Sequence, residues 1–241
     1  GKLISVLQMS PDRVKPFCGA YKRCGGCNMQ HMNYKAQLHF KTKLVRDNLE
    51  RIGGLKNVIV HDAIGMRKPL NYRNKAQYPV ASVNGTVVTG FYAARSHDVI
   101  DSEECGIQDA VSDKVRKLIL QFIVDKDLSA YDEAAGRGLL RHIVTRTGFN
   151  TGEVMVVLVI NGSALPYSGE LVEKLLNAIP EIKSIIGNIN TENTNVILGK
   201  RNILLYGNEA ITDTIGKYKV LISPHSFFQV NPEQTEVLYS K

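Results

Sequence analysis

The four cysteines of this chain form one pattern that could hold a metal centre. Three lie close together with the spacing C-x5-C-x2-C, and the fourth follows far downstream: Cys18, Cys24, Cys27 and Cys105. Three thiolates on a glycine-rich loop, joined by one from a distant segment, are typical of an enclosed metal centre. Gly25 and Gly26 allow the backbone to fold around a bulky group and to point amide donors at its sulfurs. The pattern favours a [4Fe–4S] cluster.

Two other interpretations of the cysteines stay open. Structural zinc bound by four thiolates usually takes its ligands from two C-x2-C-like pairs, and this chain has one such pair, Cys24 and Cys27. Two disulfides, or unlinked thiols, are the remaining interpretation. Disulfides persist mainly in secreted proteins, and nothing in the sequence marks the chain as secreted.

A second group of polar residues alternates along the segment Asn71–Tyr78. Arg73, Lys75 and Gln77 fall on one face of an extended strand, because side chains alternate between faces with a period of two. Such a face can contact phosphate and a base edge together. The alternative interpretation is the ordinary solvent side of an antiparallel strand.

The third unusual stretch is the loop Ser223–Asn231. Two aromatic residues and an amide, Phe227, Phe228 and Gln229, precede a new helix. Ligand pockets are largely apolar with a few polar groups, so this loop could line one for a small molecule. The alternative is that the phenylalanines belong to a hydrophobic core.

Composition and charge narrow the class of protein. The chain has 241 residues and 26.7 kDa, and 44% hydrophobic residues are enough for a real core. No apolar run is long enough to span a bilayer, and no signal peptide is visible. We therefore expect a cytoplasmic protein that does not enter a membrane.

The positive charge is localised around the cysteines. Residues 1–51 hold ten basic and three acidic residues, and this excess of seven equals the net charge of the whole chain, +7. The other residues hold 20 basic and 20 acidic residues. A localised basic region is typical of a protein that binds a polyanion such as nucleic acid. A solvated basic helix face is the alternative.

The elements that must position these residues follow from hydrophobic periodicity and turn signals. The sequence predicts helices over 34–52, 109–124 and 168–178. It predicts strands over 1–8, 57–64, 72–83, 87–94, 98–101, 139–147, 153–160, 182–190, 202–205, 210–215 and 218–222. Hairpins predominate, and Asn84-Gly85 is a strong hairpin signal. We therefore expect an α+β fold with a mostly antiparallel sheet and helices on one face.

The last residues predict the start of a further helix. Asn231 suits an N-cap, Pro232 the first helical position, and Gln234 the position three residues after the cap. So short a helix rarely stands alone. We therefore expect the chain to be a fragment of a larger protein in which another domain begins here.

Together these segments resemble the TrmA/RumA-like family of RNA uracil-5-methyltransferases, especially its Fe–S branch. The matching residues run in family order along the whole chain. They are Cys18, Cys24-Gly25-Gly26-Cys27, Gln30-His31, Tyr72-Arg73, Lys75-Ala76, Gly90-Phe91-Tyr92, Cys105, Leu140-Arg141-His142, Phe227 and Gln229-Val230-Asn231.

The resemblance implies a domain organisation. Family members carry an RNA-binding TRAM domain of OB type, a central cluster domain and a Rossmann-like domain that binds S-adenosylmethionine. Residues 1–13 would be the end of the TRAM domain, 14–224 the central Fe–S and RNA-binding domain, and 225–241 the start of the methyltransferase domain. The helix over 34–52 would pack on that catalytic domain.

The resemblance also assigns roles to single residues. The four cysteines match the ligands of a [4Fe–4S] cluster, and Phe227 and Gln229 match positions at the cofactor and substrate pocket. Arg73, Lys75 and Gln77 lie on the strand that approaches the target uridine, although one branch of the family has an arginine at the position of Gln77. The implied substrate is RNA, with ribosomal RNA preferred to transfer RNA, and the implied protein is a monomer.

Three features of the family are missing from these 241 residues. Its catalytic cysteine and its general base, a glutamate, lie in later segments, and no glycine-rich S-adenosylmethionine loop follows a strand here. We therefore expect this chain alone to be inactive and the intact protein to methylate uridine at carbon 5. A zinc-stabilised RNA-binding module and an Fe–S electron-transfer protein are the alternative functions.

Overall fold

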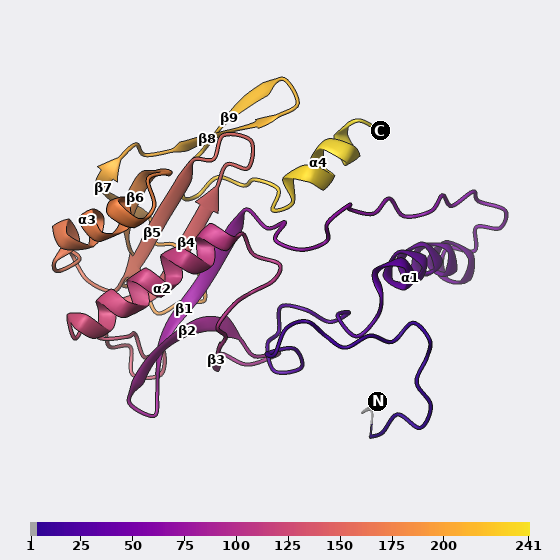
Figure 1. Cartoon of the computed structure of the whole chain (residues 1–241), viewed down its shortest axis with the longest axis horizontal. Coiled ribbons are helices and arrows are strands. Elements are labelled where there is room, and N and C mark those ends of the chain that lie inside the picture. Colours follow the sequence, from indigo (N-terminus) through magenta and orange to yellow (C-terminus); the bar gives the residue numbers. More distant parts are fainter. Residues whose placement is uncertain (1–3) are drawn as a thin grey trace.

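A seven-stranded sheet forms the body of the molecule. The computed structural model describes residues 4–241, and Figure 1 shows the sheet with strand order β3-β2-β1-β4-β5-β6-β7. The strands are β1 Lys75–Val83, β2 Thr86–Tyr92, β3 Val99–Asp101, β4 Leu140–Thr147, β5 Val154–Ile160, β6 Ile182–Ile189 and β7 Arg201–Gly207. All neighbouring pairs are antiparallel except β5 and β6. The predicted α+β fold with a mostly antiparallel sheet is confirmed.

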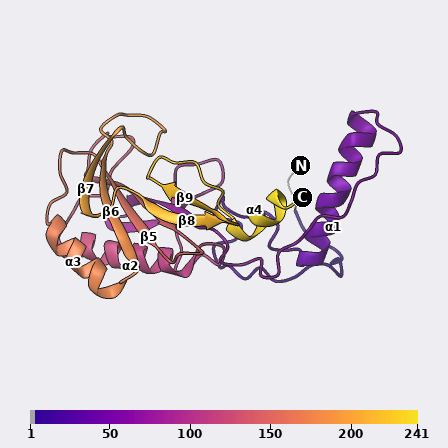
Figure 2. The ribbon, with the colours of Figure 1, turned by 90° about the horizontal axis from the view of Figure 1, so that it is seen from above.

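Different elements cover the two faces of the sheet. Helices α2 (Ala110–Asp125) and α3 (Ser168–Ala178) pack on one face, as predicted, and the hairpin of β8 (Ile211–Ile215) and β9 (Tyr218–Ile222) lies on the other (Figure 2). Each interface has its own apolar cluster. On the helix side it includes Ile119, Leu158 and Leu171, and on the hairpin side Val157 and Ile222.

Strand β5 is central because it is apolar on both faces. Its sequence Val-Met-Val-Val-Leu-Val-Ile is fully buried, whereas a strand with one solvated face would alternate. The parallel pairing with β6 needs a crossover connection, and α3 supplies it. Strands β4 and β5 are both fully buried, and they support β1, β2 and β3, which continue the sheet beyond β4.

The hairpin of β1 and β2 turns at Asn84-Gly85, as predicted. Both residues have positive φ, 51° and 80°, as a two-residue turn between twisted strands requires. The register pairs Val83 with Thr86 and Val80 with Thr89. This register directs Ala76 and Tyr78 of β1 into the helix-side core and leaves the intervening side chains on the other face.

Helix α1 stands apart from the sheet. It runs from Tyr34 to Asp47 and continues as a turn of π-helix over Asn48–Ile52, so the predicted helix over 34–52 is confirmed (Figure 1). The Asn33 side chain caps it by accepting from the Ala36 amide at 2.8 Å. Helix α4, Pro232–Tyr239, begins as predicted, with the Asn231 side chain accepting from the Gln234 amide at 3.1 Å.

Two predicted strands are wrong. Residues 57–64 form no strand and instead run beside α1, where the Ala63 amide donates to Thr42. Residues 4–8 form no strand either, and Ile4 and Leu7 are almost fully exposed. Residues 1–3 of the second prediction lie outside the described residues. A β-prone run becomes a strand only when a partner strand and a packed face are available, and neither segment has such a partner within residues 4–241.

Across residues 4–241, no helix has the length and apolar character needed to traverse a lipid bilayer.

Candidate metal centre and nucleic-acid interface

The cysteine loop is closed at its base by backbone pairing. Arg13 forms an antiparallel bridge with Met32, and the Val14 amide donates to the His31 carbonyl at 3.0 Å. Inside the loop, the Tyr21 hydroxyl donates to the Asn28 carbonyl at 2.9 Å. The loop that carries three cysteines is therefore a closed unit, held at its base by backbone hydrogen bonds.

The loop is fixed to the sheet where β2 ends. Cys24 bridges to Ala93, and the Gly25 amide donates to the Tyr92 carbonyl at 2.9 Å. A Cβ atom at Gly25 would lie 3.1 Å from the Cα of Ala94, which is tighter than ordinary contact. Gly25 is thus needed for the close approach of loop and strand, a role that differs from the predicted amide donor to sulfur.

Cys105 is held by a buried network centred on Asp113 of α2. The Asp113 carboxylate accepts from the Cys105 amide at 2.8 Å, from the Tyr78 hydroxyl at 3.3 Å and from Nε of Arg116 at 3.3 Å. The buried Arg116 guanidinium also donates to the carbonyl of residue 89 in β2 and to the carbonyls of Ser102 and residue 103. Because this network joins the segment before Cys105 to both α2 and the sheet, the fourth cysteine has a fixed place.

The four thiols lie near one another. All four cysteines are free and half-buried. Burial raises the pKa of Cys24, the amide of Gly26 (3.3 Å from its sulfur) lowers it, and the neighbouring Cys27 and Cys18 raise it. Burial likewise raises the pKa of Cys105, and Cys27 is among the groups that raise it further. The fold therefore brings the distant cysteine to the loop, and the disulfide interpretation is wrong for this structure.

The thiols are not set around one common point. Among the described residues, no group of three or more His, Cys, Asp and Glu side chains is placed to hold a metal ion. Four thiolates on one zinc ion would each lie about 2.3 Å from it, so their sulfurs would be about 3.8 Å apart. The four irons of a cubane each take one thiolate, which requires sulfurs spaced more widely than around a single ion.

The predicted polar face of β1 lies beside the cysteine site. Asn74, Ala76 and Tyr78 are buried, while Lys75 and Gln77 between them are half-buried on the face opposite α2. The predicted alternation is therefore confirmed. The segment just before β1 is tied to the residues after Cys105: the amides of 71 and 73 donate to the carbonyls of 106 and 107 at 2.9 and 3.0 Å.

Arg146 of β4 joins this face, although the sequence did not single it out. It stands directly opposite Lys75 in the pairing of β1 and β4. Burial, then Arg146 and Arg73, lower the pKa of Lys75 to about 8, and burial lowers the pKa of Arg146 to about 10. Sequence reasoning could not find Arg146 because the register that places it opposite Lys75 is a property of the folded sheet.

The loop 223–231 runs along the end of β1. The Asn74 side chain donates to the Gln229 carbonyl at 3.0 Å, and Arg146 donates to the Ser226 carbonyl at 2.5 Å. Phe228 packs against the hairpin-side core, whereas Phe227 is 86% exposed. The loop thus brings the Ser226 carbonyl to Arg146 and the Gln229 carbonyl to Asn74, while the described residues build no wall around the Phe227 ring.

A buried histidine lies at the end of the same sheet. The hydroxyl of Tyr92 is 3.3 Å from Nε2 of His142 and donates to Glu133 at 3.1 Å, and Glu133 also contacts His97. Burial, then Arg141, lower the pKa of His142 to about 4. Since Tyr92 gives its proton to Glu133, the hydrogen on Nε2 of neutral His142 faces the tyrosine oxygen. The arrangement stabilises the end of β2, where the cysteine loop is fixed.

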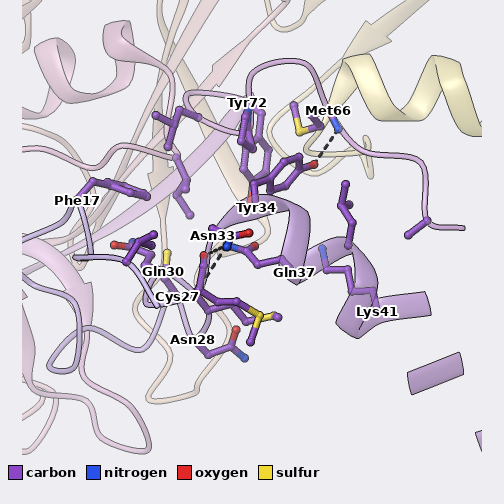
Figure 3. Close-up of a pocket in the computed structure, with 18 of the residues that line it drawn as sticks. Phe17, Cys27, Asn28, Gln30, Asn33, Tyr34, Gln37, Lys41, Met66 and Tyr72 are labelled. Atoms are coloured by element: carbon purple, nitrogen blue, oxygen red, sulfur yellow. Dashed lines mark hydrogen bonds between the residues drawn. The ribbon is translucent and has the colours of Figure 1, made fainter. Parts of the chain in front are cut away.

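A cavity of about 590 Å³ separates the cysteine loop from α1 and the segment before β1 (Figure 3). Its lining combines aromatic rings, side-chain amides and two lysines, among them Phe17, Asn28, Gln30, Tyr34, Gln37, Lys41 and Tyr72, with Lys15 and Cys27 also at its wall. Aromatic faces and amides are the groups that proteins use to stack on and read unpaired RNA bases. The Tyr34 hydroxyl accepts from the Met66 amide at 2.8 Å and fixes one side of the cavity.

Comparison with known proteins identifies similar chains over the whole length of this one. No protein-family model matches. A protein of Halalkalibacterium halodurans and one of Clostridium tetani, both named as uncharacterized RNA methyltransferases, are each 48% identical over all 241 residues. The chain covers 53% and 52% of them, so it spans about half the length of these curated relatives.

Among solved structures, the chain resembles the tRNA (uracil-54, C5)-methyltransferase of Pyrococcus abyssi, crystallised with S-adenosyl-L-homocysteine. The TM-score is 0.75 and the identity 27%, over 98% of this chain and 52% of that one. The fold therefore occurs within a larger RNA-modifying enzyme, and the similar sequences carry the name RNA methyltransferase.

Proposed function

We propose that this chain is the central part of an S-adenosylmethionine-dependent RNA uracil-5-methyltransferase. The carrying observation is its likeness over 98% of its length to a tRNA uracil-C5 methyltransferase, together with 48% identity to proteins named RNA methyltransferases. Under this proposal residues 1–13 end a TRAM domain, 14–224 form the central domain, and 225–241 begin the methyltransferase domain.

Cys18, Cys24, Cys27 and Cys105 would hold a [4Fe–4S] cluster. The nearness of the thiols supports this, since Cys27 and Cys18 act on Cys24 and Cys27 acts on Cys105. The amide of Gly26 on the Cys24 sulfur supports it too, because such donors stabilise cluster thiolates. The spacing C-x5-C-x2-C, with one distant fourth cysteine, favours the cluster over zinc, which usually takes its ligands from two C-x2-C-like pairs. When bound, the cluster would supply a structural link between the loop and the segment at Cys105.

Arg73, Lys75 and Gln77 would contact RNA near the target uridine. Their common face supports this, and so do the basic residues around the cysteine loop and the aromatic and amide lining of the adjacent cavity. The target base must leave its stack to be reached, at a cost of a few kcal/mol. Cationic contacts to the flanking phosphates would offset part of that cost.

Phe227 and Gln229 would belong to the cofactor and substrate pocket of the intact enzyme. The exposure of Phe227 supports this, because a further domain would then cover the ring. The same argument applies to α1, whose Phe40, Leu44 and Val45 are about half exposed, and which would pack on the catalytic domain.

The chemistry would come from residues outside these 241. Carbon 5 of uracil is a poor nucleophile, so the family adds a cysteine thiolate at carbon 6, and the resulting enolate attacks the methyl group of the sulfonium. A base then removes the proton on carbon 5 and the thiolate leaves. All four cysteines here are assigned to the cluster, so this chain alone would transfer no methyl group.

The substrate would be 23S ribosomal RNA, on the resemblance to the Fe–S branch of the family. Transfer RNA is the second candidate, because the similar structure from Pyrococcus abyssi is a tRNA methyltransferase. The cytoplasm, where such RNA is available and thiols stay reduced, is the corresponding location.

The test is methyl transfer from labelled S-adenosylmethionine by the full-length protein, with unmodified 23S RNA fragments and tRNA transcripts as alternative substrates. We expect label at uridine carbon 5 in the ribosomal fragment, and none with the 241-residue chain alone. Label only in tRNA would replace the substrate. No label in either, with RNA bound and zinc in place of iron, would favour a zinc-stabilised RNA-binding module, and a reversible redox couple with a partner reductase would favour an electron-transfer protein.

A further inference from the structure

Two positively charged side chains lie opposite each other on the adjacent strands β1 and β4. Lys75 of β1 and Arg146 of β4 are direct partners in the antiparallel pairing, and Arg73, two residues before Lys75, is near enough to act on its charge. Like charges at directly opposed positions destabilise a sheet. A third cation beside them increases the repulsion, and burial, followed by the two arginines, lowers the pKa of Lys75.

The cations are also poorly compensated. Arg146 is only 4% exposed; it donates to the Ser226 carbonyl, but its Nε has no hydrogen-bond partner, and the buried Nε of Arg73 has none either. Within residues 4–241 no carboxylate forms an ion pair with any of the three. A buried charge is tolerated when a charge of opposite sign or several hydrogen bonds compensate it.

A purely structural role explains only part of this arrangement. One contact from Arg146 to a neutral carbonyl fixes the loop at Ser226. It leaves Nε of the guanidinium unused and does nothing for the repulsion between Arg146 and Lys75. An anion bound by Lys75 and Arg73, close to the buried Arg146, would compensate the positive charge of all three side chains. Phosphate suits arginine donors because its oxygens accept several charge-assisted hydrogen bonds.

We propose that Arg146, Lys75 and Arg73 form a phosphate-binding subsite whose ligand is a backbone phosphate of the RNA. The identity of the ligand rests on the proposed function, whereas the subsite rests on the cross-strand pairing and on the missing partners. The contact of Arg146 with the Ser226 carbonyl puts this phosphate next to the loop that leads into α4. The subsite would hold the RNA backbone in register while a base is turned out of its stack.

The experiment measures binding of a short fluorescent single-stranded RNA to the full chain, purified without oxygen, over a range of salt concentrations. The variants are Arg146→Gln and Lys75→Gln, with Arg73→Gln in reserve should the buried Arg146 variant fail to fold. Arg201→Gln is the matched control, because it removes one exposed arginine from the edge strand β7.

We expect each subsite variant to bind about tenfold more weakly, as for the loss of one charge-assisted contact. The slope of log affinity against log salt should fall by about 0.7 for Lys75→Gln, which is the change for one lost phosphate contact on single-stranded RNA. Arg201→Gln should change neither quantity. Folded Lys75 and Arg146 variants with wild-type affinity and salt slope would overturn the subsite, and the proposed function would stand.

A second readout separates the subsite from its RNA ligand. Inorganic phosphate should raise the pKa of the Lys75 ammonium, followed by NMR, because a nearby anion favours its charged form. This rise should be lost in Arg146→Gln. If phosphate raises the pKa but no RNA binds, the subsite is correct and its assignment to RNA is wrong, together with the RNA-binding function. If neither ligand changes the pKa, the subsite is overturned.

Discussion

At the scale of single residues, the sheet holds ionisable groups in environments that disfavour their charged forms. His142 lies almost fully buried on β4, beside Tyr92 and next to Arg141 in sequence, and its Nδ1 has no partner. Both burial and the neighbouring guanidinium oppose a second proton, which explains why its pKa falls to about 4. A neutral His142 keeps the Tyr92 hydroxyl directed at Glu133, and Tyr92 in turn accepts the Gly25 amide of the cysteine loop through its backbone.

This environment predicts an acid-dependent loss of stability. His142 has a pKa of about 4 when folded and about 6.5 when unfolded. Between these values the unfolded chain binds more protons, so the free energy of unfolding must decrease as pH falls from about 6.5 to about 4. The loss should be about 2 kcal/mol between pH 7 and pH 5, measured by urea unfolding at the two pH values. In His142→Gln this part of the dependence should vanish, and an unchanged pH profile would contradict the assignment.

At the scale of elements, α2 fixes the position of Cys105 and of the segment that precedes it. Its Asp113 binds the Cys105 amide, while Arg116, one turn later, binds carbonyls of the segment between β3 and that cysteine. The helix is itself fixed by its apolar stripe in the helix-side core. Because the two charged side chains are buried together, each depends on the other.

Asp113→Asn tests this coupling. The substitution keeps the size of the side chain but leaves the Arg116 guanidinium buried without its carboxylate, which should lower the free energy of unfolding by about 3 kcal/mol. Iron content after anaerobic purification should fall as well, because Cys105 loses its fixed place. Asp109→Asn, at the start of the same helix and without a side-chain capping bond, is the control. Loss of stability with full iron content would contradict the positioning role.

Helix α1 depends on a few side-chain contacts, since it lies away from the sheet. The Thr42 hydroxyl accepts from the Ala63 amide at 2.9 Å and ties the helix to the segment that returns toward β1. Thr42→Val keeps the shape and removes the acceptor, which should cost about 1–2 kcal/mol because a half-buried amide loses its partner. Hydrogen exchange should show faster exchange at Ala63. Equal protection of that amide in Thr42→Val and the wild type would contradict the contact.

The elements that sequence predicted best are those with local signals. Helix α3 occupies the predicted residues 168–178, and the turn at Asn84-Gly85 forms as expected, because periodicity and turn chemistry are properties of the chain itself. The strand predicted over residues 57–64 was wrong because an apolar run does not reveal whether a partner strand exists. Cys105 and the face of Arg73, Lys75 and Gln77 were predicted, but Arg146 depends on a register that only the folded sheet defines.

At the scale of the whole molecule, charge, cysteines and sheet edge converge. The cysteine loop lies in the basic part of the sequence, the loop is fixed to β2, and the segment after Cys105 is tied to the residues that lead into β1. Figures 1 and 2 show this region between the sheet and α1, at the side from which α4 also extends. A cluster bound there would connect the basic loop mechanically to the proposed RNA face.

The measurement that tests this account most directly is the content of iron, acid-labile sulfide and zinc in anaerobically purified protein. The account predicts about four irons and four sulfides per chain, as for a cubane held by four thiolates, and their loss in Cys105→Ser together with a lower melting temperature. Zinc without sulfide would contradict it, as would a Cys105→Ser protein that keeps its iron and its melting temperature.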